Sequence, residues 1–478
     1  MIQLNNNPKI EEFIDLFKAK LYQLPIDKAI YQAEQLGLLL RANEVGIYSL
    51  NDVESFLVDE FAKLLSICLN FKKLDNNQPE KILFIATELY NIGGHTRLME
   101  RLATFLESKP DLLITKKPTD DILQREKLFF SDIHHGFECN VSVVETVSSI
   151  LKEVLNYDLL ILNIHPEDIY AVVACGLAKK INKNLKIHFV NHADHTFSYG
   201  SSISDVWYEI SEYGIAIDSM RGLNAQKCFL GIPIDISKSI NEEKFTFKNG
   251  DLILTAASAF KYKPNNAHSI MPLVGALLDE YNKSKLQVIG VNLITNYWWW
   301  QLKLKYPGRL KISSTLPYDD YLKTTSEAKL YIDSHPFPGG TAFAEQFLQG
   351  RLCSGLISFY QGYSPAEMLK AENEHKVISF IKNSYFYDFN SVYDATIATH
   401  DIKNVKARFI SAIEGNCYSH NVLSNYVINI TPVVKHKIEY VPDNFNIFSF
   451  SFLCKMWRVS TTVSFFKYII KKLMPRFS

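Results

Sequence analysis

The sequence predicts an α/β protein with two doubly wound, Rossmann-like domains that face each other across a cleft. Short apolar runs, typical of buried parallel strands, alternate with helical stretches along most of the chain. The alternation begins at Lys81–Ala86 and starts afresh at Leu252–Ala256. A glycine pair lies in each series, at Gly93-Gly94 and at Gly339-Gly340. Because doubly wound domains bind ligands at the carboxyl ends of their strands, we expect the ligand between the two domains.

An N-terminal helical region is predicted at residues 1–78. The segments Ile10–Phe17 and Asp52–Leu65 repeat apolar residues at i, i+3 and i+4, as amphipathic helices do. The polar segment Asp75–Pro79 then reads as a linker to the first Rossmann-like domain.

The first Rossmann-like domain is predicted at 79–245 and the second at 246–430. In the first, the expected strands are Lys81–Ala86, Leu112–Thr115, Val141–Glu145, Leu159–Asn163, Ile187–Asn191 and Ile215–Ile217. In the second, they are Leu252–Ala256, Leu286–Val291, Leu310–Ile312, Leu330–Asp333, Leu352–Ile357 and Val377–Phe380.

The composition is that of an ordinary globular protein, with 47% hydrophobic and 21% charged residues. A formal net charge of zero argues against nucleic acid as a partner. The seven cysteines form no CxxC pair and no Cys/His ligand spacing, so we expect reduced thiols and no metal site. No signal peptide is recognisable, and no apolar run reaches the length of about 18 residues that a membrane-spanning helix needs.

The segment His335–Thr341 is the most informative part of the second domain. A strand runs into a turn made of Pro338, Gly339, Gly340 and Thr341, and a helix follows. Backbone N–H groups at a helix start, together with the helix dipole, favour a phosphate or diphosphate. An ordinary tight turn is the alternative.

Other residues of the second domain are candidates for the same ligand. Lys261 and Lys263 follow the first strand and could reach a diphosphate. Glu345, one turn into the helix, could accept hydrogen bonds from sugar hydroxyls, and Tyr321 could stack on a nucleobase. Surface lysines and ordinary aromatic packing are the alternatives.

The first domain supplies two groups of candidates. Gly93, Gly94, His95 and Arg97 form the first turn and helix start, where they could contact an acceptor or a phosphate. The segment Asn191–His195 follows a strand, and its His192, Asp194 and His195 could provide a general base with an orienting carboxylate. Their spacing matches no standard zinc site. Surface or structural roles are the alternatives for these residues.

These motifs resemble glycosyltransferases of the GT-B architecture over about residues 80–430. The second domain resembles the O-GlcNAc transferase type, including its bacterial relatives, through Lys261, the Gly339-Gly340-Thr341 loop and Glu345. The resemblance implies that the lysine and the loop hold the donor diphosphate and that Glu345 holds the ribose. The sequence departs from the family at Ala342, where a second threonine is frequent, and at Tyr321, where the family has a histidine near the uracil. The first domain resembles bacterial glycosyltransferases with GGHTR and NHADH segments.

The resemblance implies a metal-independent, inverting glycosyltransferase in bacterial surface-polysaccharide or glycoconjugate assembly. The donor would be a nucleotide sugar, UDP-linked, with no further cofactor. The acceptor would be a glycan, a lipid-linked molecule or a protein. Two alternatives stay open at this point: a sugar-nucleotide 2-epimerase of the same architecture, and a non-catalytic nucleotide-sugar-binding scaffold at the membrane.

Residues 431–478 are predicted to form C-terminal helices that end in a basic amphipathic helix. From Lys455 to Ser478 there are six Lys/Arg and no Asp/Glu, interleaved with aromatic and aliphatic residues. Such a tail suits an anionic membrane surface, so we expect a cytoplasmic protein held peripherally on the inner face of the cell membrane. A helix packed on the protein's own surface is the alternative.

Overall fold

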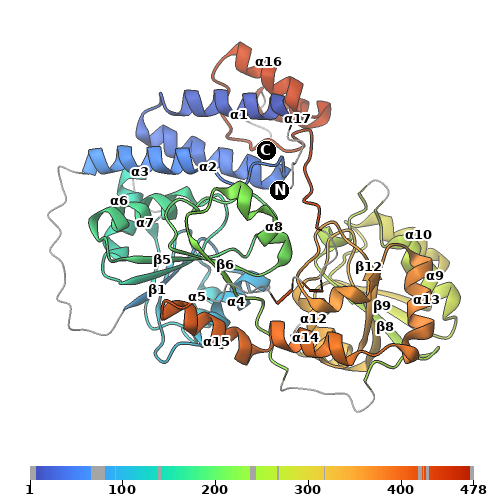
Figure 1. The fold of residues 1–478 in the computed structure, drawn as a ribbon. Coiled ribbons are helices and arrows are strands. Elements are labelled where there is room, and N and C mark those ends of the chain that lie inside the picture. Colours follow the sequence, from blue (N-terminus) through green and yellow to red (C-terminus); the bar gives the residue numbers. More distant parts are fainter. Residues whose placement is uncertain are drawn as a thin grey trace.

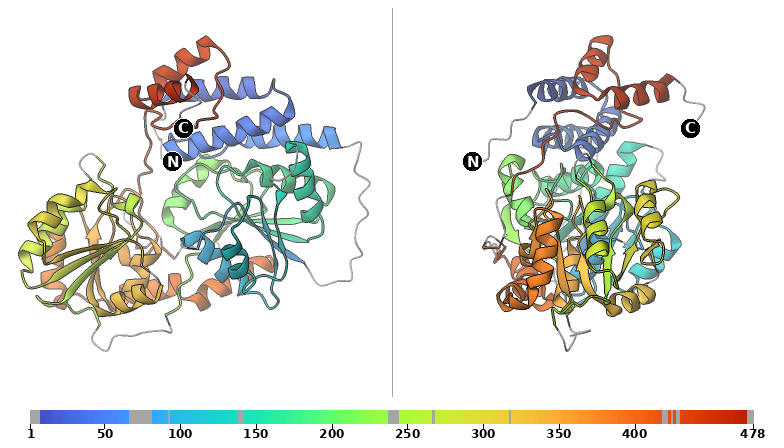
Figure 2. Two further views of the ribbon diagram at one scale, coloured as in Figure 1. Left: turned by 180° about the vertical axis from the view of Figure 1, so that it is seen from behind. Right: turned by 90° about the vertical axis from the view of Figure 1, so that its right-hand side faces the viewer.

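Two parallel sheets, each covered by helices, lie side by side, and a third layer made only of helices lies over the first sheet (Figures 1 and 2). This computed structural model describes residues 7–65, 81–91, 93–137, 142–236, 244–265, 268–316, 318–417, 422, 423, 425, 426 and 430–473.

The first sheet has seven parallel strands in the order β3-β2-β1-β4-β5-β6-β7. In the central strands the side chains on both faces are buried, which explains their continuous apolar sequence. The strands are β1 Ile82–Ala86, β2 Asp111–Ile114, β3 Ile133–His134, β4 Leu159–Asn163, β5 Lys186–Val190, β6 Val206–Glu209 and β7 Gln226–Phe229. The helices between them are α4 Gly94–Ala103, α5 Asp120–Glu126, α6 Val143–Val154, α7 Ile169–Ile181 and α8 Glu212–Arg221.

The second sheet has six parallel strands in the order β10-β9-β8-β11-β12-β13. Both sheets therefore reverse their strand order beside the first strand of the series, and this reversal opens a crevice at the carboxyl ends. The strands are β8 Leu252–Ala256, β9 Lys285–Ile289, β10 Leu310–Ser313, β11 Ala328–Ile332, β12 Leu352–Leu356 and β13 Lys370–Ala371. The helical elements are η2 Ala259–Tyr262, α9 Met271–Glu280, η3 Tyr297–Trp299, α10 Trp300–Lys305, α11 Tyr318–Glu327, α12 Thr341–Leu348, η4 Pro365–Leu369, α13 Glu374–Asn383, η5 Ser384–Phe386 and α14 Asn390–His400.

Helix α15 (Ile402–Ile413) follows the second series but packs on the first sheet. Its Val405, Phe409 and Ala412 join the core that holds Phe84 of β1. The range 246–430 predicted for the second domain thus includes a helix of the first core.

The chain's two ends build the helical layer together (Figure 1). The N-terminal helices are α1 Pro8–Leu21, α2 Ile26–Asn43 and α3 Asn51–Leu65, and the C-terminal helices are α16 Phe450–Val459 and α17 Thr462–Leu473. Helix α3 packs on α7 of the first domain, and α1 packs on α16. The predicted tail is therefore two helices, one face of which is buried in the protein's own core.

Three predicted strands are wrong. The described part of Val141–Glu145 enters α6, Ile215–Ile217 belongs to α8, and Val377–Phe380 belongs to α13. Short apolar runs fit a buried strand and a buried helix face equally well, so the pattern alone does not separate them. The strands β3, β6, β7 and β13 were not predicted. The predicted linker Asp75–Pro79 lies outside the described residues.

Candidate functional site

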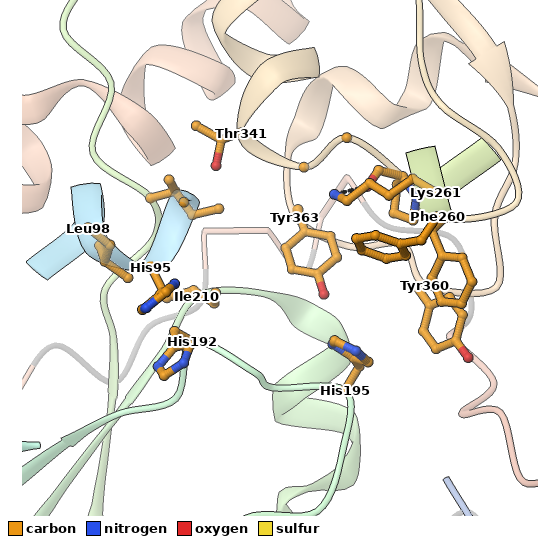
Figure 3. Close-up of a pocket in the computed structure, with 16 residues that line it drawn as sticks. His95, Leu98, His192, His195, Ile210, Phe260, Lys261, Thr341, Tyr360 and Tyr363 are labelled. Carbon is orange, nitrogen blue, oxygen red and sulfur yellow. Dashed lines mark hydrogen bonds between the residues drawn. The ribbon is translucent and has the colours of Figure 1, made fainter. Parts of the chain in front are cut away.

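A cavity of about 260 Å³ lies between the two domains at the carboxyl ends of their strands (Figure 3). Nine predicted residues line it: Gly94, His95, His192, His195, Lys261, Pro338, Gly339, Gly340 and Thr341. Seven lining residues were not predicted: Leu98, Ile210, Ile232, Phe260, Phe337, Tyr360 and Tyr363. Most of these are apolar or aromatic, and such side chains give no chemical signal in a single sequence.

The turn between β11 and α12 is held by a buried carboxylate, Asp333. Its Oδ1 accepts hydrogen bonds from the backbone N–H groups of Ser334, at 2.9 Å, and Gly339, at 2.8 Å. A Cβ on Gly339 would lie 2.5 Å from that oxygen, so only glycine fits there. The N–H of Gly339 is therefore not free for a phosphate, because it already donates a hydrogen bond to Asp333.

Gly340, which also lines the cavity, has free space where a side chain would stand. Its φ of +56° is strained for any residue with a side chain, yet a Cβ there would meet nothing within 4 Å. Gly340 precedes Thr341, the first residue of α12. The start of an eight-residue helix, with its dipole, therefore points at the cavity.

Lys261 braces the same turn from η2. Its Nζ donates to the backbone oxygen of Pro338 at 2.7 Å, and burial lowers its pKa. Lys263 is exposed and lies outside the cavity lining. Of the two lysines, only Lys261 therefore reaches the turn.

Glu345 and Tyr321 lie near one another, outside the cavity lining. Burial raises the pKa of Glu345, while the positive charges of Arg101, Arg97 and Arg351 oppose that rise. Arg97 and Arg101 belong to α4, so Glu345 faces the first domain. Burial and the charge of Glu345 raise the pKa of Tyr321 to about 12.

Three imidazoles of the first domain lie close together, and two of them, His95 and His192, line the cavity. The ring of His95 stacks on His192 with centroids 5.4 Å apart and meets His165 edge-on at 5.8 Å. Burial lowers the pKa of all three, that of His165 to about 4 and that of His192 well below its ordinary value. All three are therefore neutral at pH 7. His165 was not predicted, although its place just after β4 was a usable signal.

The glycine pair of the first domain is not under strain. Gly93 has an extended backbone with φ of 171°, and a Cβ on Gly94 would meet nothing within 4 Å. Gly94 lines the cavity, whereas Gly93 and Arg97 do not.

Asp194 and His195 form the only His–carboxylate contact among the described cavity-lining histidines. Asp194 is fully buried, accepts hydrogen bonds from Ser211 and Tyr363, and has its Oδ1 3.6 Å from His195 Nδ1. The His195 side chain is 35% exposed. His192 has no such carboxylate, and its Nδ1 has no partner among the described residues. The predicted pairing of imidazole and carboxylate thus exists for His195.

Within the described residues, no group of three or more His, Cys, Asp or Glu is arranged to hold a metal ion. No described helix is both long and apolar enough to cross a membrane.

Comparison with known proteins gives a likeness of structure only. No protein-family model matches the sequence, and no curated protein matches it. Among solved structures, the HepE protein of Anabaena in complex with UDP is 12% identical, with a TM-score of 0.53 over 70% of this chain and 100% of that one. TarM is 10% identical, with a TM-score of 0.53 over 71% of this chain and 99% of its own. A glycosyltransferase from Rickettsia africae is 12% identical, with a TM-score of 0.52 over 73% and 100%. The chain therefore has the two-domain Rossmann-like fold of GT-B glycosyltransferases.

Proposed function

We propose that this protein is a glycosyltransferase that moves a sugar from a UDP-sugar to an acceptor hydroxyl. The observation that carries the proposal is the cavity itself. The start of α12, with Gly340 open to solvent, faces the histidines of the first domain across it (Figure 3). The fold supports the same reading, since a solved protein of this fold binds UDP.

In this proposal the donor diphosphate lies on Gly340 and Thr341, next to Lys261. The helix dipole and the ammonium group stabilise the negative charge that builds on UDP as the bond between the sugar and the β-phosphate breaks. UDP leaves with the electron pair of that bond. Glu345 holds the ribose, and Tyr321 lies toward the nucleobase.

His195 is the base in this proposal. The acceptor oxygen forms the new bond to the anomeric carbon and gives its proton to His195. Asp194, at 3.6 Å, then stabilises the imidazolium. His192 is less suited to this role, because its lowered pKa makes it a weaker base. A single displacement of this kind inverts the anomeric configuration and uses no metal.

The helical layer is proposed to hold the enzyme on an anionic membrane at its cytoplasmic face. One side of α16 and α17 is buried, but Phe450, Val463 and Leu473 on the other side are 80%, 78% and 76% exposed. Arg458, Lys467 and Lys472 of the same two helices are also exposed. Apolar and basic side chains on one surface favour an anionic bilayer, where a lipid-linked glycan acceptor of a bacterial surface polymer would lie.

The test is release of free nucleoside diphosphate from UDP-, GDP-, CMP- and TDP-sugars, with and without candidate acceptors. We expect release from one UDP-sugar, stimulated by an acceptor and matched by a new glycosidic product. Conversion of the donor to its 2-epimer would instead identify an epimerase. Tight UDP binding with no turnover for any acceptor would identify a binding scaffold.

A further inference from the structure

A chain of polar contacts connects the donor turn with His195 on the opposite domain. It starts at Asp333. The Oδ1 of Asp333 accepts a hydrogen bond from the N–H of Gly339, and its Oδ2 lies 2.7 Å from the ammonium of Lys370. The side chains of Asp333 and Lys370 are each 1% exposed. A Cβ on Gly355 would lie 3.2 Å from Asp333, so glycine at that position leaves room for the pair.

Lys370 extends the chain to a second carboxylate. Its Nζ donates to Glu367 Oε1 at 3.2 Å, and Glu367 Oε2 accepts from the backbone N–H groups of Gly362 and Tyr363. Although burial acts to lower the pKa of Lys370, the charges of Asp333 and Glu367 raise it overall. The lysine therefore stays charged between two carboxylates and ties the donor turn to the segment 362–363.

Tyr363 then crosses to the first domain. Its hydroxyl donates to Asp194 Oδ1 at 2.9 Å, the same oxygen that lies 3.6 Å from His195 Nδ1. The carbonyl oxygen of Gly362 accepts the N–H of Glu212 at 2.8 Å, a second contact between the domains. In Figure 3 the hydroxyl of Tyr363 is directed toward the segment that carries His195.

We propose that Lys370 and Tyr363 are positioning residues that couple occupancy of the donor turn to the state of His195. A diphosphate on Gly340 and Thr341 orders the turn. Asp333 and Lys370 transmit the position of the turn to Glu367. Tyr363 then sets how much of the Asp194 carboxylate is available to His195. The inference rests on the proposed function, because it assumes that a nucleoside diphosphate binds this turn.

The experiment compares Tyr363→Phe with the parent protein. The substitution deletes one hydroxyl and keeps the ring in the cavity wall. The pKa of His195 is measured by NMR of labelled histidine, with and without UDP, and UDP affinity is measured by calorimetry. We expect UDP to shift the His195 titration in the parent, and Tyr363→Phe to lose most of this shift while it binds UDP within about threefold of the parent.

Tyr360→Phe is the matched control. Tyr360 lies in the same segment and lines the same cavity, but its hydroxyl donates to Glu44 and not to this chain of contacts. This variant should keep the UDP-dependent shift. Lys370→Met tests the other end and should weaken UDP binding at least tenfold. If Lys370→Met does not fold, the comparison of Tyr363→Phe with Tyr360→Phe still tests the coupling.

An equal UDP-dependent shift in Tyr363→Phe and the parent would overturn the coupling and leave the proposed function standing. Absence of UDP binding to the parent would instead overturn the proposed function, and the coupling with it.

Discussion

The two glycine turns that face the cleft look alike in sequence and differ in structure. In the second domain, Gly339 is fixed by the Asp333 carboxylate and Gly340 has a φ of +56°. In the first domain, Gly93 is extended with φ of 171° and Gly94 has free space around it. In the second domain the rigid turn requires its glycine pair. In the first domain the glycine pair only leaves free space at the start of α4.

The two domains also differ in the charges of their residues near the cavity. The second domain offers a helix N-terminus and the ammonium of Lys261, which favour an anion. The first domain offers the imidazoles of His95, His165 and His192, which burial keeps neutral. Under the proposed function, this contrast favours the diphosphate on the second domain and an uncharged acceptor hydroxyl on the first.

The largest effect should come from the first domain. His195→Ala removes the proposed base and should lower kcat by roughly 10²- to 10⁴-fold, with UDP affinity unchanged. His192→Ala should cost less, because His192 lacks a carboxylate partner. Steady-state kinetics with saturating donor measures both variants. A larger loss for His192→Ala than for His195→Ala would reverse the assignment of the base.

Substitution in the rigid turn should weaken donor binding instead of lowering kcat. Gly340→Val forces a branched side chain into a backbone conformation that suits only glycine, at a cost of about 1–3 kcal/mol for the strain alone. Because the N–H groups at the start of α12 must shift, we expect UDP affinity to fall at least tenfold. Gly93→Ala is the control from the first domain and should bind UDP as the parent does. Calorimetry would contradict the comparison if both variants bound equally well.

The two lysines after β8 provide a matched pair within the second domain. Lys261→Ala deletes a charged donor and should weaken UDP binding by about 1.5–3 kcal/mol, the range for a hydrogen bond to a charged group. Lys263→Ala removes an exposed charge that lies outside the cavity lining and should change UDP affinity less than twofold. Equal losses in the two variants would mean that general charge, and not contact with the turn, determines affinity.

The neutral imidazoles of the first domain predict a stability that depends on pH. His165 has a pKa of about 4 in the folded protein, against about 6.5 in the unfolded chain. The unfolded state therefore binds the extra proton as pH falls below about 6.5, and the folded state is destabilised. At pH 5 this costs about 2 kcal/mol relative to pH 7. Replacing His165 by Asn should make the difference in unfolding free energy between pH 7 and pH 5 smaller by that amount, as measured by urea unfolding. An unchanged difference would show that His165 is not buried in its neutral form.

The sequence predicted the parts of the fold in which local pattern and tertiary structure agree. The strand Leu252–Ala256 is found with the predicted bounds, because a short run of apolar or small residues that starts directly after a charged residue, Asp251, is typical of a buried parallel strand. Val377–Phe380 was misread because its apolar residues also fit one face of a helix. Helix α15 was assigned to the second domain because nothing local shows that it returns to the first sheet.

Some residues of the candidate site could likewise be predicted from the sequence, and others could not. Residues at helix starts and strand ends, such as Gly340 and His195, could be selected because their positions in βα units are readable. Asp333, Lys370 and Tyr363 could not, because each acts through a partner that is distant in the sequence or crosses the cleft. A buried lysine between two carboxylates looks like any other lysine until the strand pairing is known.

The smallest expected effect concerns the helical layer. The prediction compares this layer with the exposed surface of the second domain. Truncation after Asn444 is a poor test, because Phe445, Phe452 and Met456 belong to the core that α16 shares with α1. Substitution of exposed residues leaves that core intact. Trp457 and Phe466 are 42% and 50% exposed, and each is followed in the sequence by an exposed basic residue, Arg458 and Lys467.

The double variant Trp457→Ser/Phe466→Ser should bind anionic liposomes several-fold more weakly than the parent in co-sedimentation. Each exposed basic residue near an anionic surface contributes about 1 kcal/mol, so the remaining charges should keep part of the binding, and salt should weaken it. The control is Tyr385→Ser/Phe386→Ser, which removes two aromatic side chains that are 75% and 76% exposed on the second domain. If the control loses as much liposome binding as the first variant, exposed aromatic residues in general bind lipid and the helical layer has no special role. If only the first variant loses it, the first domain, over which this layer lies, is the side of the enzyme held at the membrane (Figure 2).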